Sequence, residues 1–245
     1  DGFRDFAGQV KGPLFAGPGC ADLAGAESYG RPGDRYTYRD VRLEGGVQAF
    51  TLVLDGTEIA THAGLPGLHN VENAVAAAAL AHAVGMPAAA IAQAIASFRG
   101  VARRFDRRAS AAGRHYIDDY AHHPTEVQAT LEAALLSGRR VRVFFQPHRL
   151  LRTQELWEAF AQALKGAHEV VVLPVYTAGE RGRESPEALS DRIAKRLEDL
   201  GRPARRMDKE EALAYARATA RPEDLLLFMG AGDVTLLARR LVHEG

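Results

Sequence analysis

The chain has 245 residues, a length that suits one large domain or two smaller ones. Its 31 basic and 31 acidic side chains give a formal net charge of zero, which argues against bulk electrostatic binding to nucleic acid or to an anionic membrane. Hydrophobic residues make up 47% of the chain, but no apolar run is long enough to cross a bilayer, so we expect neither a membrane nor a nucleic-acid partner.

The cysteine content and the first residue bear on the compartment of the protein. Cys20 is the only cysteine, which excludes an internal disulfide and favours a reducing, cytoplasmic environment. It lies in a Gly-Pro-Gly-Cys loop without a neighbouring base, so we expect an inert thiol. The chain begins at Asp1 rather than methionine and shows no signal peptide, so we expect its natural amino terminus to be missing or processed.

Residues 1–66 are predicted to form strands and turns, because alternating or apolar runs are separated by Gly-Gly and Asp-Gly pairs. The expected strands cover residues 35–41, 47–54 and 58–62. Together they predict a meander at the edge of a sheet.

Two helices are expected next. The first is Ala-rich and covers residues 73–84, with Gly85 as its stop. Pro87 suits the first turn of the second helix, and Gly100 closes it. The arginine-rich segment 99–108 then indicates a linker or hinge.

From residue 114 onward, short apolar runs alternate with amphipathic segments. Strands are expected at 115–120, 140–145, 169–175, 204–207 and 225–229, and helices at 125–136, 153–164, 186–200, 210–218 and 234–242. Such alternation predicts an α/β fold, in which a mostly parallel sheet is covered by helices on both faces.

The densest group of functional side chains lies where the first of these strands gives way to a helix. Asp118 and Asp119 point to opposite faces of a strand, so at most one of them faces a given ligand. An aspartate at the end of a parallel strand can accept hydrogen bonds from a ribose diol. The alternative is that one aspartate caps the next helix, but Thr125 is better placed for that, which favours a functional site.

Two adjacent histidines in the same stretch raise the question of a metal. His122, His123 and Glu126 do not have the His-Glu-x-x-His spacing of zinc proteases, and neighbouring side chains on an extended backbone point apart. We therefore expect no metal ligands here, and substrate contact by one histidine is favoured over a histidine that is merely satisfied at a strand end.

A second group follows the next strand. Arg149 and Arg152 are three residues apart, so on a first helical turn they would share a face beside His148. Two guanidinium groups are unfavourable at a helix amino terminus unless an anion lies between them, and their planar forks match carboxylate or phosphate. This pattern favours an anion site over a solvated basic helix start.

Two further loops carry weaker signals. Asn70 can cap the Ala-rich helix, but capping leaves Asn73 unexplained, and both amides could face one ligand such as adenine. The run from Gly230 to Asp233 suits either a phosphate-binding turn or a tight packing turn. The sequence contains no Gly-x-x-x-x-Gly-Lys-Ser/Thr loop and no Gly-x-Gly-x-x-Gly, so a dehydrogenase interpretation is weak.

The order of these motifs resembles the Mur ligases of peptidoglycan synthesis, most of all the members that join L-alanine to UDP-N-acetylmuramate. The matching pieces are His69-Asn70-x-x-Asn73, Arg103-Arg104-Phe105, Asp118 through Glu126, Phe145-Gln146-Pro147-His148-Arg149, Tyr176-x-Ala178-Gly179-Glu180 and Gly230-Ala231-Gly232-Asp233. The resemblance implies that residues 1–101 are the end of a central ATP-binding domain and 102–245 a carboxyl-terminal Rossmann-like domain. ATP and Mg²⁺ would be required, with the P-loop and the magnesium ligands upstream of this chain.

The resemblance also implies roles for individual residues. Asn70 and Asn73 would contact adenine, Asp119 the ribose and Arg104 the phosphates. The remaining residues, which would hold alanine and the substrate carboxylate, are Tyr120, His122, His148, Arg149 and Arg152. His122 or His148 could remove a proton from the alanine ammonium group.

One departure and two alternatives accompany the resemblance. Leu150 and Leu151 stand where the family usually has Tyr and Thr, which removes any hydroxyl contact there. A relative that attaches a recycled tripeptide to UDP-N-acetylmuramate differs at residues 146–149, so this stretch favours alanine addition. A non-catalytic nucleotide-binding module is the alternative from a different class.

Domain closure is expected at the arginine-rich hinge, and the fragment alone is expected to be inactive.

Overall fold

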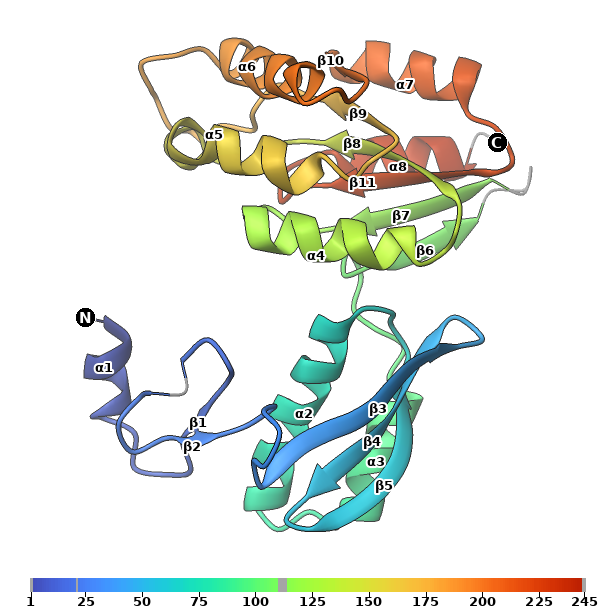
Figure 1. Ribbon diagram of the computed structural model, residues 1–245. Coiled ribbons are helices and arrows are strands. Elements are labelled where there is room, and N and C mark those ends of the chain that lie inside the picture. The colour runs from blue at the N-terminus through green and yellow to red at the C-terminus, as the bar shows by residue number, and fades with distance from the viewer. Residues whose placement is uncertain (1, 21, 110–113, 244–245) are drawn as a thin grey trace. The chain divides into compact units, whose positions relative to one another are not determined.

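The computed structural model describes residues 2–20, 22–109 and 114–243 of the chain (Figure 1). These residues form two compact units, Asp1–Arg99 and Gly100–Gly245, each with a hydrophobic core of its own. No helix in the described part of the chain has the length and apolar character that a bilayer span requires.

The first unit is built on a three-stranded antiparallel meander. Its strands are β3 (Tyr36–Glu44), β4 (Val47–Leu54) and β5 (Thr57–Ala63), which confirms the predicted meander. Helices α2 (Leu68–Ala83) and α3 (Ala88–Ser97) pack on it, and two short parallel strands, β1 (Phe15–Ala16) and β2 (Glu27–Ser28), precede it. The chain begins with helix α1 (Gly2–Ala7), so the prediction of strands and turns alone for this region was wrong.

The start of α2 differs from the predicted one. The helix begins five residues earlier than expected, after Gly67, whose φ of 105° is readily adopted only by glycine. Asn70 therefore lies inside the helix, where its Nδ2 donates to the Pro66 carbonyl at 2.8 Å, and the prediction that it caps the helix was wrong. Gly85, at φ 92°, follows the last residues of α2, as predicted.

The second unit contains a six-stranded sheet in the order β10-β9-β8-β11-β7-β6. Its strands are β6 (Asp106–Ala109), β7 (His115–Asp119), β8 (Arg140–Phe145), β9 (Glu169–Val172), β10 (Ala204–Arg206) and β11 (Asp224–Met229). All pair in parallel except β6, which runs antiparallel to β7. The mostly parallel sheet is confirmed, but segment 99–108, interpreted as a linker, contributes most of an additional edge strand.

Helices cover both faces of this sheet, as predicted (Figure 1). One face carries α4 (Pro124–Leu135), α5 (Leu150–Leu164) and α6 (Pro186–Asp199), which pack against one another in that order. The other face carries α7 (Lys209–Thr219) and α8 (Thr235–His243). Right-handed crossovers explain why the helices divide between the two faces. The connections from β7 through β8 and β9 to β10 all move in one direction across the sheet, so their helices lie on one face. The connection from β10 back to β11, which lies between β7 and β8, moves in the opposite direction and places α7 on the other face.

The central strands fix where the functional loops meet. Every residue of β11 is buried, and the Phe144 and Phe228 rings stack at 4.9 Å between centroids. In the strand register Met229 lies opposite both Asp119 and Phe145. Because these strands are parallel, the loops that follow β7, β8, β9 and β11 leave from the same edge of the sheet, where open α/β sheets bind ligands.

Candidate functional site

Four aromatic rings form a row at this edge. The Tyr120 and His122 centroids are 5.3 Å apart, those of His122 and His148 are 6.0 Å apart, and those of His148 and Tyr176 are 5.5 Å apart. The first two residues follow β7, the third follows β8 and the fourth follows β9. The structure therefore brings together the three ring-bearing residues of the predicted site and Tyr176, which the sequence indicated only as part of the Tyr176–Glu180 motif.

Main-chain hydrogen bonds join the loops that carry these rings. The Tyr176 amide donates to the Pro147 carbonyl and the Arg149 amide donates to the Tyr176 carbonyl, both at 2.8 Å. The Gly230 amide donates to the Asp119 carbonyl at 3.1 Å, which extends the β7–β11 pairing by one step. The rings are thus carried by a backbone that is itself fixed.

The environment of His148 favours an uncharged imidazole. Burial is the largest cause that lowers the pKa of His148, and the charges of His122, Arg152 and Arg149 lower it further, with Glu180 acting in the opposite direction. The Nδ1 atom is buried and has no hydrogen-bond partner among the described residues. A neutral imidazole with a free nitrogen is chemically suited to accept a proton.

His122 is held differently. Its Nδ1 lies 3.0 Å from the Tyr120 carbonyl oxygen and 3.2 Å from Glu126 Oε2. The same Glu126 oxygen accepts from the His122 and His123 amides, so this carboxylate organises the start of α4. Within the described residues no group of three or more His, Cys, Asp or Glu side chains is arranged to hold a metal.

The cap of α4 corrects one prediction. His123 is the N-cap: its Nδ1 accepts from the Thr125 amide at 3.4 Å, and Glu126 completes a capping box. Thr125 lies one position inside the helix after Pro124, so the prediction that Thr125 caps it was wrong.

Arg149 and Arg152 were predicted to share the first turn of a helix, and this prediction was wrong. Helix α5 begins at Leu150, and Arg149 is its N-cap, with a φ of 71°. Its Nε donates to Glu180 Oε1 at 2.6 Å, so Arg149 is paired with the loop after β9. Arg152 lies in the first turn, and its Nη1 is buried without a hydrogen-bond partner in the described part of the chain.

The leucines that follow Arg149 have separate roles. Leu150 is buried in a small cluster with Val175 and Leu189, whereas Leu151 is half exposed. Leu150 therefore contributes packing between α5 and the loop after β9, not a polar contact to a ligand.

The two aspartates of β7 are both buried and both accept hydrogen bonds. Asp118 accepts from the Thr235 hydroxyl of α8. Asp119 accepts from the Phe105 amide at 2.6 Å, the Ala121 amide at 2.8 Å and the Thr130 hydroxyl at 3.2 Å. Since a carboxylate offers about four acceptor positions, about one position on Asp119 is not filled by the described residues. Its contact with ribose stays a prediction.

Arg103 and Arg104 flank Tyr120, with guanidinium carbons 4.9 Å and 5.4 Å from its ring centroid. Arg104 is exposed, which suits the predicted contact with phosphates. Arg103 points inward and its Nη2 donates to the Gly230 and Gly232 carbonyls at 2.6 Å and 3.1 Å. The sequence showed Arg103 only as the neighbour of Arg104 and did not predict this anchor.

Gln146 is a second residue that the predicted site lacked. Its Nε2 donates to Asp233 Oδ1 at 2.8 Å, and its Oε1 accepts from the Val234 amide at 3.0 Å. A Cβ on Gly232 would lie 2.5 Å from that oxygen, so only glycine fits there. The Gly230–Asp233 turn thus packs tightly against Gln146, the residue that follows β8.

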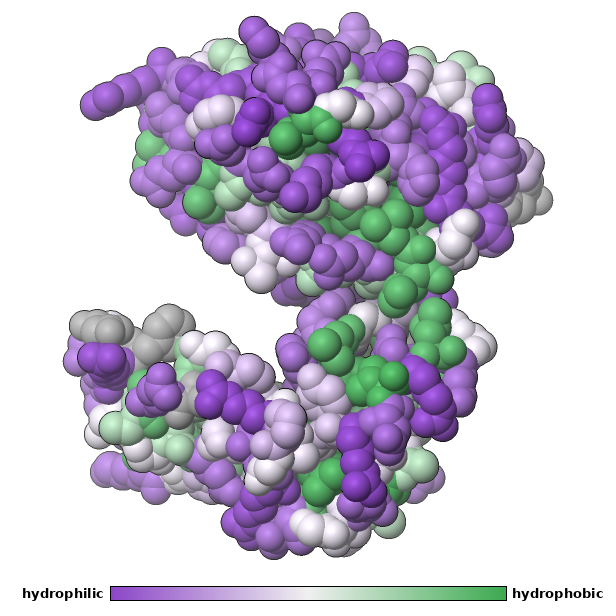
Figure 2. Space-filling view, in the orientation of Figure 1, coloured by the Kyte–Doolittle hydropathy of each residue, from purple (hydrophilic) through white to green (hydrophobic). Residues whose placement is uncertain are grey.

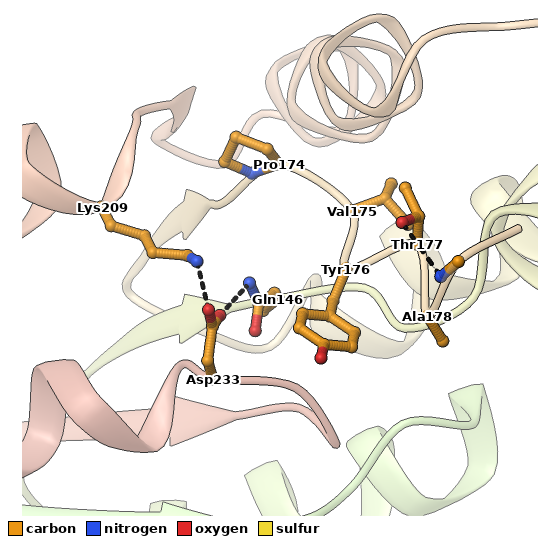
Figure 3. A pocket seen from close by; sticks show the side chains of 9 residues that line it. Gln146, Pro174, Val175, Tyr176, Thr177, Ala178, Lys209 and Asp233 are labelled. Carbon is orange, nitrogen blue, oxygen red and sulfur yellow. Dashed lines mark hydrogen bonds and ion pairs between the residues drawn. The ribbon is translucent and has the colours of Figure 1, made fainter.

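A pocket of about 360 Å³ opens beside this turn (Figure 3). Its wall is formed by Gln146, Pro174, Val175, Tyr176, Thr177, Ala178, Gly179, Lys209 and Asp233. Lys209, at the start of α7, forms an ion pair with Asp233, as Figure 3 shows. The pocket therefore combines an apolar side with one charge pair.

Asn70 and Asn73 belong to the first unit. They lie three residues apart near the start of α2, which places them on one side of the helix, and Asn73 is exposed. Their contact with adenine stays a prediction.

Comparison with known proteins identifies related chains. The family described as "Mur ligase, glutamate ligase domain" matches residues 103–232. The UDP-N-acetylmuramate–L-alanine ligase of Streptomyces coelicolor is 43% identical over 197 residues, covering 79% of this chain and 42% of that protein. The ligase of the same name from Deinococcus radiodurans is 36% identical over 255 residues, covering 98% of this chain and 52% of that protein.

Solved structures agree with these matches. The UDP-N-acetylmuramate-alanine ligase MurC of Thermotoga maritima superposes with a TM-score of 0.72 at 30% identity, covering 89% of this chain and 47% of that one. The chain thus spans about half the length of the relatives that it matches.

Proposed function

The chain belongs to the Mur ligase family, and on that premise we propose that it contributes part of the active site of an ATP-dependent ligase that joins L-alanine to the lactyl carboxylate of UDP-N-acetylmuramate. The observation that carries the proposal is His148, whose buried Nδ1 has no hydrogen-bond partner among the described residues and which lies beside Arg149 and Arg152 at the carboxyl ends of parallel strands. The base can take a proton from the amine, and the two cations can neutralise the charge of the carboxylate with which the amine reacts. Since ATP is the phosphoryl donor, we place the reaction in the cytoplasm.

The chemistry has two steps. The lactyl carboxylate takes the γ-phosphoryl group of ATP, which gives an acyl phosphate and ADP. The alanine nitrogen then attacks the acyl carbon, the bond from that carbon to the phosphate oxygen breaks, and inorganic phosphate leaves. Arg149 and Arg152 stabilise the negative charge on the carboxylate and on the tetrahedral intermediate, because guanidinium groups match these oxygens.

The alanine ammonium group loses two protons, one before its nitrogen attacks and one as the amide forms. The free imidazole nitrogen of His148 takes the first, because burial lowers the pKa of this ring and favours its neutral form, and the second leaves with the departing phosphate. His122, whose Nδ1 already lies against the Tyr120 carbonyl and Glu126, serves with Tyr120 to position the amino acid.

The nucleotide is proposed to bind through Asn70 and Asn73 at adenine, Asp119 at ribose and Arg104 at the phosphates. The exposed Arg104 guanidinium suits this role, and Asp119 can offer the ribose its one remaining acceptor position. Mg²⁺ accompanies ATP in such reactions, and the described residues show no group of three or more His, Cys, Asp or Glu side chains arranged to hold a metal. We therefore place no magnesium ligand on them, and no step above runs through the metal.

The test is a chimera in which the upstream half of the Deinococcus radiodurans ligase precedes this chain. With ATP, UDP-N-acetylmuramate and radiolabelled L-alanine, the chimera should release phosphate and form the labelled amide, whereas the 245-residue chain alone should not. A soluble chimera that hydrolyses ATP but forms no amide would overturn the proposal. Faster reaction with the recycled tripeptide than with alanine would assign the activity to the tripeptide ligases instead.

A further inference from the structure

Tyr176 stands between the proposed amine site and the pocket described above. One face of its ring stacks on His148, with centroids 5.5 Å apart and planes inclined by 8°. The same side chain lines the pocket of about 360 Å³ (Figure 3). The ring therefore contacts His148 and forms part of the wall of the pocket.

The backbone of Tyr176 is held independently of its ring. Its amide donates to Pro147 and its carbonyl accepts from Arg149, both at 2.8 Å. The absence of a side chain at Gly232 lets Tyr176 sit close, because a Cβ there would come within 2.8 Å of Tyr176 Cβ and Cγ. A smaller side chain at position 176 would thus remove the wall and leave the loop in place.

The pocket behind the ring suits a side chain of an amino acid. Its volume exceeds that of any single amino-acid side chain, and Pro174 and Val175 supply apolar contact. In the wall of the pocket Asp233 is held between Lys209 and Gln146. Alanine, whose side chain is one methyl group, needs none of this space.

We propose that Tyr176 determines which amino acid the ligase accepts. Its ring closes the amine site beside His148 to side chains larger than a methyl group and keeps them out of the pocket. The effect is steric exclusion of larger side chains, on the scale of the discrimination that pocket size gives for apolar substrates, about 10–200-fold. This inference rests on the proposed function and names the selectivity of the same site.

The test compares Tyr176→Ala with Tyr176→Phe in the chimera, with kcat/KM measured for L-alanine, L-valine and L-leucine. Tyr176→Ala should raise the leucine-to-alanine ratio of kcat/KM by about tenfold or more, on the scale that pocket size gives for apolar substrates. Tyr176→Phe keeps the ring and should keep the wild-type ratio. If Tyr176 had a purely structural role, Tyr176→Ala would lower kcat/KM for all three amino acids by the same factor. The leucine-to-alanine ratio would then be unchanged, and this result would overturn the inference.

Two arrangements keep the test decisive. If Tyr176→Ala does not fold, as judged by its thermal unfolding, Tyr176→Val replaces it, and an unchanged ratio there also overturns the inference. If the wild-type chimera is soluble and hydrolyses ATP but forms no amide, the proposed function fails and the selectivity is tested on the 245-residue chain. There, the His148 ring-proton resonance should shift with L-leucine in Tyr176→Ala and not in wild type, and no shift in either would overturn the inference.

Discussion

The carboxylate of Glu180 binds both Arg149 and the helix that Arg149 caps. Glu180 Oε1 accepts from Arg149 Nε at 2.6 Å, and Oε2 accepts from the Leu151 amide at 3.2 Å. The Leu151 amide lowers the pKa of Glu180 most, and Arg149 lowers it further, so the carboxylate stays ionised at neutral pH. This contact helps to hold Arg149 at a φ of 71°, a value that few residues other than glycine adopt.

We expect Glu180→Gln to raise the KM for the carboxylate substrate more than it lowers kcat. The amide removes the charge that orients Arg149, and the guanidinium then samples other positions before substrate binds. Steady-state kinetics of the chimera would measure this. Glu184→Gln is a matched control: Glu184 lies in the same loop as Glu180, pairs with Arg192 of α6 at 2.9 Å and has no place in the site. Equal effects of the two changes would contradict a positioning role for Glu180.

Arg149→Ala should have a larger effect than the loss of its partner. Removing a group that stabilises developing negative charge costs about 10²–10³ in kcat in comparable sites, and we expect a loss of that order in kcat/KM. Arg192→Ala, the exposed arginine of the control pair, should leave the kinetics within about twofold of wild type. Wild-type kinetics in Arg149→Ala would remove this residue from the site.

The pKa of His148 gives a prediction with a defined sign. Because the pKa is lowered in the folded chain, the unfolded chain binds a proton first as pH falls below the ordinary value of about 6.5. The associated stability is therefore complete above pH 6.5 and is lost as pH falls further. The His148 ring-proton resonance, assigned with His148→Asn, should titrate with a midpoint below 6.5 in the 245-residue chain.

The causes of that shift can be separated by substitution. Arg152→Met removes a positive charge that lowers the pKa of His148 and should move the midpoint upward. Glu180→Gln removes the opposing negative charge and should move it downward. Shifts in the same direction for both variants would show that loop rearrangement, rather than charge, sets the pKa.

The parallel sheet was predictable because its central strands are short apolar runs, and such a run indicates a buried strand without information from distant parts of the chain. Strand β6 was missed because it is four residues long and arginine-rich, and it exists only through its pairing with β7. The position of Arg149 before α5, rather than within it, depends on Glu180, which lies 31 residues away. Local helix rules cannot show such a contact.

The same reasoning applies to the candidate site. The residues at strand ends were predictable, since parallel strands bring their carboxyl ends together. The anchoring contacts of Arg103 and Gln146 join residues 127 and 87 positions apart, and their sequence neighbours give no sign of them. His123 was overlooked as a cap because imidazole is not among the preferred capping groups.

A buried charge network lies on the edge of the sheet opposite the site. Arg142, only 2% exposed, donates to Glu169 at 2.7 Å, to Asp224 at 3.2 Å and to the Thr219 hydroxyl at 2.8 Å. Glu169 begins β9 and Asp224 begins β11, and both carboxylates are almost fully buried. One guanidinium group thus connects β8 to the two strands beside it.

We expect Arg142→Leu to lower the free energy of unfolding of this unit by about 3–5 kcal/mol, because it leaves two buried carboxylates without their main partner. Arg140→Leu is the matched control: Arg140 is on the same strand, is 40% exposed and lies 3.5 Å or more from the same carboxylates, so about 1 kcal/mol or less should be lost. Trp157 is the only tryptophan and lies in α5, so its fluorescence in urea reports unfolding of this unit. A loss below about 1 kcal/mol for Arg142→Leu would mean that the surrounding arginines already neutralise both carboxylates.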